Sequence, residues 1–297
     1  MKAADQASRK QVFENQYCLR RLTQMAQSKS DIYSQYGIKY DRKENKIYHK
    51  LFGWINPLLI NGNDKLGKGV YTFSTLPTNK SFNVTLPTPG IGGTIDITIN
   101  GTCPCHCTGC YATKGRYTFQ NVIEANARKT YLARYDIDFM INAIIAQIKA
   151  DRITLCRIHA SGDFMNGLYI EAWKRIVKEC PDTVFWTYTK NIKAEAAFDE
   201  LDNINVVKSI IPGYGFNFGH CDYIIKVYNA LKAIGKSVYI CRCGIDKNQH
   251  CTNCKGCSKN EVVLFIEHST NYKASEDPCF EELKQIIEAQ DKSVIGK

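Results

Sequence analysis

From residue 94 onward, two kinds of apolar pattern alternate along the chain. Short runs that are apolar at alternate or successive positions predict strands at 94–99, 153–160, 183–189, 204–211, 237–240 and 261–266. Longer stretches with apolar residues three and four positions apart predict helices at about 121–150, 168–179, 192–201, 223–233 and 280–289. Strands that alternate with helices in this way indicate an α/β fold with a parallel sheet and right-handed crossovers.

The chain before residue 94 has a different composition. Gln11–Gln27 mixes charged and apolar residues as helices do, whereas 53–93 is rich in Gly, Pro and Asn, which is typical of loops and short strands. We therefore expect an N-terminal extension at 1–93, a partial (β/α)6 barrel at 94–270 and a C-terminal helix within 271–297. In such barrels the functional residues gather at the C-terminal ends of the strands.

Overall composition sets broad limits on function. The chain has 297 residues, and Lys plus Arg outnumber Asp plus Glu by 39 to 29, which gives a net charge of +10. This excess is compatible with an acidic partner such as nucleic acid, and equally with a solvated basic surface. The sequence contains neither an apolar run long enough for a membrane helix nor the apolar core of a secretion signal, so we expect a cytoplasmic protein.

Cysteine is the residue that narrows the chemistry most. The chain has 14 cysteines, and a cytoplasmic protein of this size is not expected to hold them in disulfides, which favours metal or cluster ligation. Most lie in two groups, Cys103, Cys105, Cys107 and Cys110, then Cys241, Cys243, Cys251, Cys254 and Cys257. We expect the others to be buried small side chains or inert surface thiols, namely Cys18, Cys156, Cys180, Cys221 and Cys279.

In the first group, Cys103, Cys107 and Cys110 have the spacing C-x3-C-x2-C, and Tyr111 follows. Three cysteine ligands leave one iron of a cubane cluster open. Here the chain resembles the radical S-adenosylmethionine superfamily, in which such a loop follows the first strand of a partial barrel and ends in an aromatic residue. The resemblance implies a 4Fe-4S cluster, S-adenosylmethionine at the open iron, and an electron donor such as flavodoxin or ferredoxin. Because Cys105 and His106 are further ligand candidates, a closed zinc or iron site and a redox-active thiol loop stay open as alternatives.

A polar turn, Ser161-Gly162-Asp163, closes the second predicted strand after His159. In the radical superfamily a Gly-Gly-Glu-type turn at this place holds the amino group of the cofactor. The resemblance therefore implies that Ser161, Gly162 and Asp163 bind the cofactor, with His159 and Tyr111 beside them. Asp is one carbon shorter than Glu, so the contact is either mediated by water or absent. The alternative is that Ser161 and Asp163 cap the following helix.

The second group, Cys251, Cys254 and Cys257, forms a compact C-x2-C-x2-C run. Cys241 lies ten positions before this run, with Cys243 as the alternative to it. A compact run with one distant cysteine resembles ferredoxin-type ligation, which implies a second 4Fe-4S cluster. A structural zinc site with four cysteine ligands is the alternative.

A second family resemblance covers a longer part of the chain, about residues 61–268. Lys65–Lys68, Thr102–Pro104, His159–Phe164 and Pro181–Lys190 occur in the order found in the phage "gene product 88" family. This implies a phage or mobile-element origin and supports the pairing of Cys241 with the later run, but the family has no settled activity to transfer. The segment between Leu76 and Gly101 is longer than the pattern of the family.

Two further residues follow predicted strands: Lys190 and His268. Either could bind substrate or move a proton, although polar residues are common at strand ends in any case. The leading hypothesis is an enzyme in which cleavage of S-adenosylmethionine starts radical chemistry on an unknown substrate. The alternative is a non-catalytic, metal-stabilised phage protein that binds nucleic acid or a protein partner.

Overall fold

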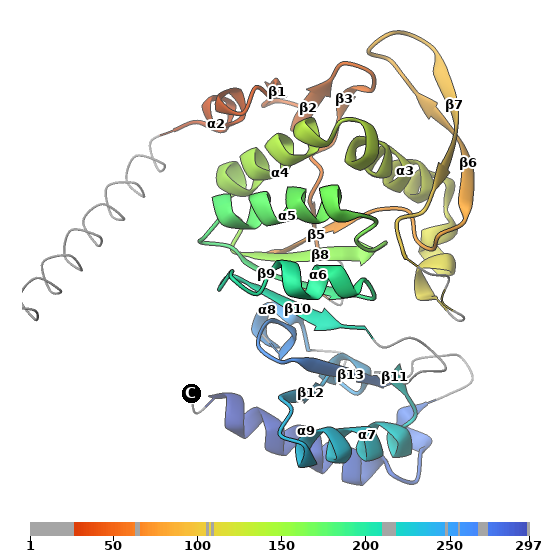
Figure 1. The fold of residues 1–297 in the computed structure, drawn as a ribbon, viewed down its shortest axis with the longest axis vertical. Helices are drawn as coiled ribbons and strands as arrows, with labels where there is room; N and C mark the ends of the chain where they lie inside the picture. Colours follow the sequence, from red (N-terminus) through yellow and green to blue (C-terminus); the bar gives the residue numbers. More distant parts are fainter. Residues whose placement is uncertain are drawn as a thin grey trace, which may run out of the picture.

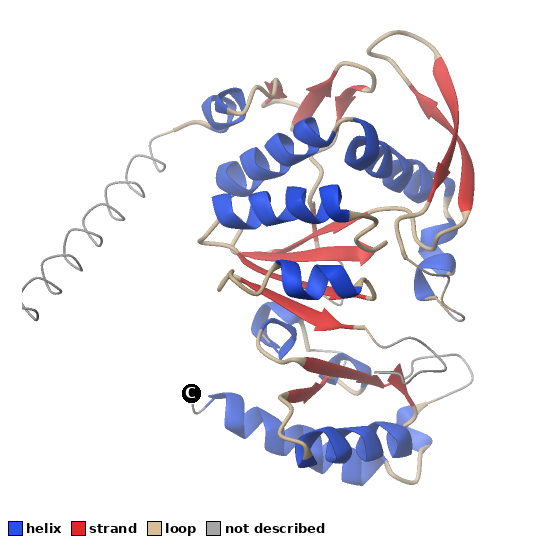
Figure 2. Ribbon diagram, viewed as in Figure 1, coloured by secondary structure: helices blue, strands red, loops and turns tan. Residues whose placement is uncertain are grey.

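A central, mostly parallel sheet organises the protein (Figures 1 and 2). The computed structural model describes residues 27–62, 66–104, 107, 110–209, 218–246, 249–254, 256–266 and 273–295, so the helix expected at Gln11–Gln27 lies almost wholly outside them. The strand order is β10-β9-β8-β5-β4, in which only β4 runs antiparallel to its neighbour. These strands are β4 Ile60–Asn61, β5 Val70–Ser74, β8 Leu155–Ser161, β9 Val184–Thr189 and β10 Ile204–Lys208.

Helices connect the parallel strands: α3 Gln120–Tyr135, α4 Ile137–Asp151, α5 Gly167–Glu179 and α6 Ile192–Ala197. The helical region predicted at 121–150 consists of two helices, α3 and α4. They are separated at Asp136, whose φ of −144° and ψ of 59° lie outside the helical region. The carboxylate of Asp136 lies 3.3 Å from Nε2 of His49, and this contact holds the chain in place at the break between the two helices.

Different parts of the chain cover the two faces of the sheet. Because side chains alternate along a strand, neighbouring residues lie on opposite faces. Ile158 and Phe185 belong to the main core that also contains Ile144 of α4 and Trp173 of α5. Trp186, the neighbour of Phe185, instead packs with residues of the second cysteine group.

The strand predicted at 94–99 forms, but it is not the first strand of the parallel sheet. β7 Thr94–Asn100 pairs antiparallel with β6 Ser81–Pro87 in a separate hairpin (Figure 1). β5 occupies the position beside β8 that was expected for the strand at 94–99. The segment assigned to an N-terminal extension therefore contributes two strands, β4 and β5, to the sheet. The alternation in Thr94–Asn100 is typical of a half-exposed antiparallel strand, whereas parallel strands are apolar on both faces.

A second parallel sheet has the order β11-β13-β12, with β11 Phe218–Gly219, β12 Val238–Ile240 and β13 Val262–Ile266. Its core includes Ile224, Leu264 and Leu283, contributed partly by α7 Cys221–Ala233 and α9 Phe280–Ile295. β10 contacts β13, but among the described residues no ladder of hydrogen bonds joins the two sheets. The partial barrel therefore stays a prediction.

Short elements complete the fold. The described N-terminal part contains α2 Lys29–Gln35, β1 Tyr40–Asp41, β2 Lys46–His49 and β3 Gly53–Ile55. The cysteine-rich segment after β12 contains α8 Cys251–Cys254 and the 3-10 turns η3 Arg242–Gly244 and η4 Gly256–Ser258. The other 3-10 turns are η1 Tyr111–Thr113, η2 Gly115–Thr118 and η5 Ala274–Glu276.

Candidate metal and cofactor site

The first cysteine loop lies at the C-terminal ends of β5 and β8, although it follows β7 in the sequence. The amide of Cys103 donates to the carbonyl of Thr78 at 3.0 Å, just beyond the end of β5. The hydroxyl of Tyr111 donates to the carbonyl of Ala160, near the end of β8, at 2.5 Å. The loop is thus fastened to the sheet edge at which the predicted site was expected.

Gly162 sits where the loop and the two strands meet. Its φ is +86°, and a Cβ at this position would lie 1.9 Å from Oγ1 of Thr75 and 2.5 Å from Oγ1 of Thr102. These two hydroxyls are 2.7 Å apart, and Thr102 also accepts from the amide of Asp163 at 3.0 Å. The close backbone approach that only glycine permits is therefore an approach to the protein's own threonines.

Asp163 is buried and braces the turn against β9. Its carboxylate accepts from the Thr189 hydroxyl at 2.6 Å and from the amides of Phe164 and Lys190 at 2.7 and 2.8 Å. Burial raises the pKa of Asp163, and these hydrogen bonds oppose that shift. The carboxylate is thus an acceptor of internal hydrogen bonds.

Ser161 is also buried, and its hydroxyl donates to the carbonyl of Thr75 at 3.0 Å. The capping role considered for Ser161 and Asp163 is wrong. The N-cap of α5 is Asn166, whose Oδ1 accepts from the amide of Tyr169 at 2.9 Å. The turn is too far before the helix to supply the cap.

His159 lies in the aromatic core next to α5. Its φ of +61° is left-handed and interrupts the alternation of side chains along β8. Its Nε2 lies 2.9 Å from the hydroxyl of Tyr169, and its ring lies edge-on to Trp173. Burial, reinforced by the charge of Arg157, lowers the pKa of His159 to about 3. The ring is therefore neutral throughout the physiological range.

The thiols of the first loop lie near one another and near the carboxylate of Asp163. Burial raises the pKa of Cys103 to about 12, with further contributions from the nearby Asp163, Cys110 and Cys107. Thiols are soft ligands, so this donor set fits iron or zinc, which would bind the deprotonated thiolates. Among the described residues, no three His, Cys, Asp or Glu side chains are already arranged around one point, and Cys105 and His106 lie outside them.

The second cysteine group lies over one face of the sheet, near the N-terminal ends of its strands. Cys251 and Cys257 pack with Leu155 and Trp186, and the Asn205 side chain donates to the carbonyl of Cys257 at 2.7 Å. These cysteines therefore lie over the face of the sheet and not at the edge that holds the first loop. Only Cys241 directly follows its strand, and the chain then folds back across the sheet face.

Within this group, Cys243 is hydrogen-bonded to both Cys241 and Cys251 and raises the pKa of each. The structure thus brings Cys243 into the group, and both alternatives for the fourth ligand stay open. The hydroxyl of Tyr239 lies 3.0 Å from Sγ of Cys254.

The segment 66–68 supports the second group. The amide and hydroxyl of Thr252 donate to the carbonyls of Leu66 and Lys68 at 3.3 and 3.0 Å. A Cβ on Gly67 would lie 2.7 Å from Oγ1 of Thr252, so glycine is required for this approach. The described part of the Lys65–Lys68 motif, residues 66–68, therefore forms a contact between distant parts of the chain.

Arg157 connects the two cysteine groups. Its Nη2 lies 3.4 Å from the hydroxyl of Tyr111, at the end of the first loop. A hydrogen bond from Cys243 together with burial raises the pKa of Cys251, and burial raises that of Cys257; the positive charge of Arg157 opposes both shifts. No sequence motif marks Arg157, and only the tertiary structure shows its position between the two groups.

Of the two weaker candidates for a catalytic role, Lys190 and His268, the structure describes only Lys190. Lys190 lies beside the turn, and its Nζ donates to the hydroxyl of Ser209 at 2.8 Å. His268 lies outside the described residues.

Comparison with known proteins now places this arrangement in a family. The profile of the family described as "Gene product 88" matches residues 57–268, most of the chain. The chain belongs to the Gene product 88 family. The resemblance to this phage family is thereby confirmed, and the family match includes both cysteine groups and the turn at Gly162.

Two Gene 88 proteins from phages are similar to parts of this family member. The protein from Mycobacterium phage L5 is 38% identical over 61 residues, which cover 20% of this chain and 25% of the phage protein. The protein from Mycobacterium phage D29 is 31% identical over 81 residues, which cover 23% and 33%. The alignments thus span a quarter to a third of these relatives. No solved structure matches the chain.

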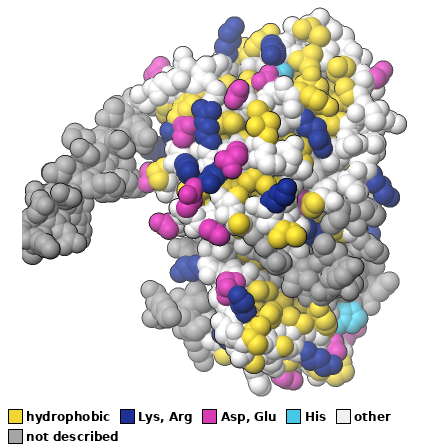
Figure 3. Space-filling model, in the orientation of Figure 1, with side chains coloured by type: hydrophobic (Ala, Val, Ile, Leu, Met, Phe, Trp, Pro, Cys, Tyr) yellow, Lys and Arg dark blue, Asp and Glu magenta, His cyan; other side chains and the backbone are white. Residues whose placement is uncertain are grey.

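The described part of the chain contains no helix that is both long and apolar enough to span a membrane. On the face shown in Figure 3, basic and acidic side chains are interspersed. This face therefore does not form a single basic patch.

Proposed function

We propose that this member of the Gene product 88 family is an iron–sulfur enzyme of the radical S-adenosylmethionine type. Cys103, Cys107 and Cys110 are the proposed ligands of its open 4Fe-4S cluster. The observation that supports this most is the position of their loop, fastened through Tyr111 to the C-terminal end of β8. Functional residues of parallel α/β proteins gather at this edge.

When bound, the cluster would supply the electron that cleaves S-adenosylmethionine. The residues of the chain hold and shape the site. Tyr111, which is 58% exposed, offers an aromatic side chain next to the loop. Ser161 and Gly162 form the adjoining edge for the cofactor. Asp163 acts through the turn that it braces, because its carboxylate already accepts three hydrogen bonds.

His159 is proposed to support this edge from the core side, and Lys190 to face the substrate. The second cysteine group would hold an auxiliary cluster or a zinc ion, with an electron donor such as flavodoxin or ferredoxin reducing the protein. A cytoplasmic location fits these oxygen-sensitive groups.

A second candidate function is a non-catalytic, metal-stabilised phage protein that binds a protein or nucleic acid. The second cysteine group favours it, because Cys254 and Cys257 pack with the buried Val207 and Tyr239 much as a structural metal site does. The internal hydrogen bonds of Asp163 also suit a purely structural turn.

The decisive experiment is anaerobic purification followed by iron, sulfide and zinc analysis. Electron paramagnetic resonance spectra would be recorded with and without S-adenosylmethionine. We expect iron and sulfide, and a signal of the reduced protein that changes when the cofactor is added. Cys107→Ala should lose this response, whereas Cys279→Ala, outside both groups, should keep it. Zinc alone after careful iron reconstitution would instead favour the metal-stabilised binding protein.

A further inference from the structure

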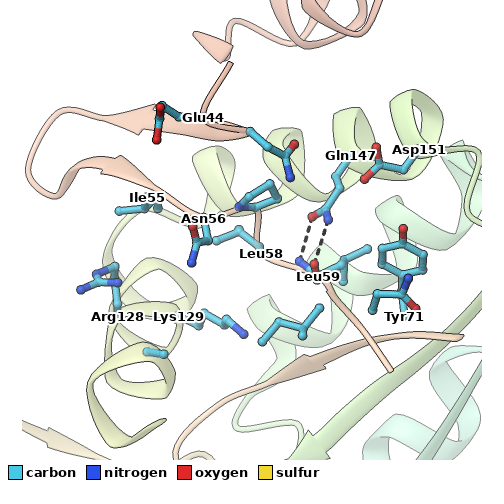
Figure 4. Close-up of a pocket in the computed structure, with 15 residues that line it drawn as sticks. Glu44, Ile55, Asn56, Leu58, Leu59, Tyr71, Arg128, Lys129, Gln147 and Asp151 are labelled. Carbon is cyan, nitrogen blue, oxygen red and sulfur yellow. Dashed lines mark hydrogen bonds between the residues drawn. The ribbon is translucent and has the colours of Figure 1, made fainter. Parts of the chain in front are cut away.

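A cavity away from both cysteine groups lies between α3, α4 and the segment 55–61 (Figure 4). Its volume is about 420 Å³, which is within the range of small-molecule sites. No cysteine lines it, so it is independent of the proposed cluster site.

Two adjacent cations of α3 form one end of this cavity. Lys129 is only 6% exposed, and its Nζ is buried with no hydrogen-bond partner in the described part of the chain. Its side chain extends from α3 toward the segment with Leu58 and Leu59 (Figure 4). Nε of Arg128 is likewise buried without a partner.

The aromatic contacts of these cations do not replace an anion. Nζ of Lys129 lies 5.6 Å from the ring centre of Phe73, and the guanidinium of Arg128 lies 5.6 Å from that of Phe52. Such contacts stabilise a cation only modestly, whereas burying an unpaired charge is costly. Burial lowers the pKa of Lys129 to about 8, and the neighbouring Arg128 lowers it further in the same direction.

Both acids that line the cavity, Glu44 and Asp151, are paired with lysines outside it, Glu44 with Lys46 at 3.9 Å. Asp151 pairs with Lys29 at 2.5 Å. The amide of Gln147 both donates to and accepts from the backbone of Leu59 at 2.8 Å. Each of the two acids of the cavity thus has a lysine partner, whereas Arg128 and Lys129 keep their positive charge at the other end.

We propose that this cavity binds a small organic carboxylate. Lys129 and Arg128 would hold the carboxylate, and Ile55 and Leu58 would contact the apolar part of the ligand. Apolar walls favour an organic acid over a fully hydrated inorganic anion, which would lose its water without compensation. A carboxylate would give Lys129 the charge partner that the described residues do not supply.

The test is binding of hexanoate to the full chain by calorimetry. Hexanol is the uncharged control ligand, and inorganic phosphate is the anion without an apolar part. We expect hexanoate to bind at least about tenfold more tightly than either, because a charge-assisted hydrogen bond contributes on the order of one such factor. Lys129→Met and Arg128→Gln should each abolish this preference.

Lys149→Met is the matched control variant. Lys149 lies on the neighbouring α4, does not line the cavity, and already bonds the hydroxyl of Tyr36 at 2.5 Å. Thermal melting of each variant checks folding, and Arg128→Gln keeps the test valid if Lys129→Met fails to fold. Hexanoate binding that both cavity variants leave unchanged would overturn the proposal, as would equal affinity for phosphate or no binding to the wild type.

Discussion

The guanidinium of Arg157 lies over the aromatic ring of Tyr188, with 5.1 Å between Cζ and the ring centre. The two residues occupy adjacent parallel strands, β8 and β9. Arg157 contacts Tyr111 on one side, and Tyr188 is hydrogen-bonded to Cys257 on the other. The stacked pair is therefore shared by both cysteine groups.

If the second cysteine group holds a metal as proposed, replacing Arg157 should weaken its retention. Arg157→Met removes the charge that favours the thiolate forms of Cys251 and Cys257, and changes next to metal ligands typically cost ten- to hundredfold in affinity. We expect a loss of roughly tenfold, measured as metal per chain during competition with a chelator. Arg175→Met, which only breaks an exposed pair with Glu179, is the control. Identical retention in both variants would contradict the shared role of Arg157.

Gly162→Ala should destabilise the protein far more than an ordinary glycine substitution. The new Cβ would overlap the hydroxyls of Thr75 and Thr102, and the left-handed φ adds strain. We expect a loss of roughly 3 kcal/mol or more in the free energy of unfolding by urea. Gly235→Ala is the matched control, because its φ is +78° and a Cβ there would meet nothing within 4 Å, so about 1 kcal/mol is expected. Equal losses would show that the threonines move aside freely.

Asp163→Asn tests whether the carboxylate is a structural brace. The amide keeps one acceptor oxygen but turns a donor toward a group that also donates, either the Thr189 hydroxyl or the Lys190 amide. We expect a loss of about 2 kcal/mol in the free energy of unfolding, which is the cost of an unsatisfied buried group. The exposed Asp202→Asn should change it by less than about 0.5 kcal/mol. A fully stable Asp163→Asn would argue that the carboxylate serves a ligand and not the fold.

His49 should make the stability of the protein depend on pH. Its Nδ1 accepts from the amides of Leu51 and Phe52 at 3.2 Å, so the neutral ring carries its proton on Nε2, which faces Asp136. Burial lowers the pKa of His49 below its ordinary value of 6.5, although Asp136 opposes this shift. As the pH falls, the unfolded chain therefore takes up this proton at a higher pH than the folded protein does. The stabilisation that comes from burying neutral His49 is complete above the ordinary pKa of histidine and declines as the pH falls below it.

Urea unfolding between about pH 7 and pH 5 measures this dependence. His49→Gln removes the titrating group, so its free energy of unfolding should fall less steeply over this interval than that of the wild type. An unchanged slope would assign the pH dependence to other residues.

Elements with strong local patterns were predicted well from the sequence. The helix expected at 168–179 is α5 Gly167–Glu179, and the strand expected at 183–189 is β9 Val184–Thr189. β5 was missed because its short apolar run lies among Gly, Pro and Asn, where local signals favour loops. Its place in the sheet depends on pairing with β8, which is distant in the sequence.

In the candidate site, too, local features were predicted from the sequence and contacts between distant segments were not. The cysteines were found because their residue type and spacing carry the chemistry by themselves. The contact of Gly162 with Thr75 and Thr102 was not predicted, since it exists only when three separate segments meet. Arg128 and Lys129 look like ordinary surface residues of a helix, and only the tertiary structure shows that their polar atoms are buried.

The β6–β7 hairpin leaves the body of the protein and returns to it at the same place. The amide of Thr102 donates to the carbonyl of Leu76 at 3.0 Å, and the amide of Gly101 donates to the carbonyl of Lys80 at 2.9 Å. Evolution can therefore lengthen, shorten or exchange this arm without moving the residues on either side. Related phages that carry arms of different length would still present the first cysteine loop to the same strand ends, so sequence divergence in this arm need not signal divergence in chemistry.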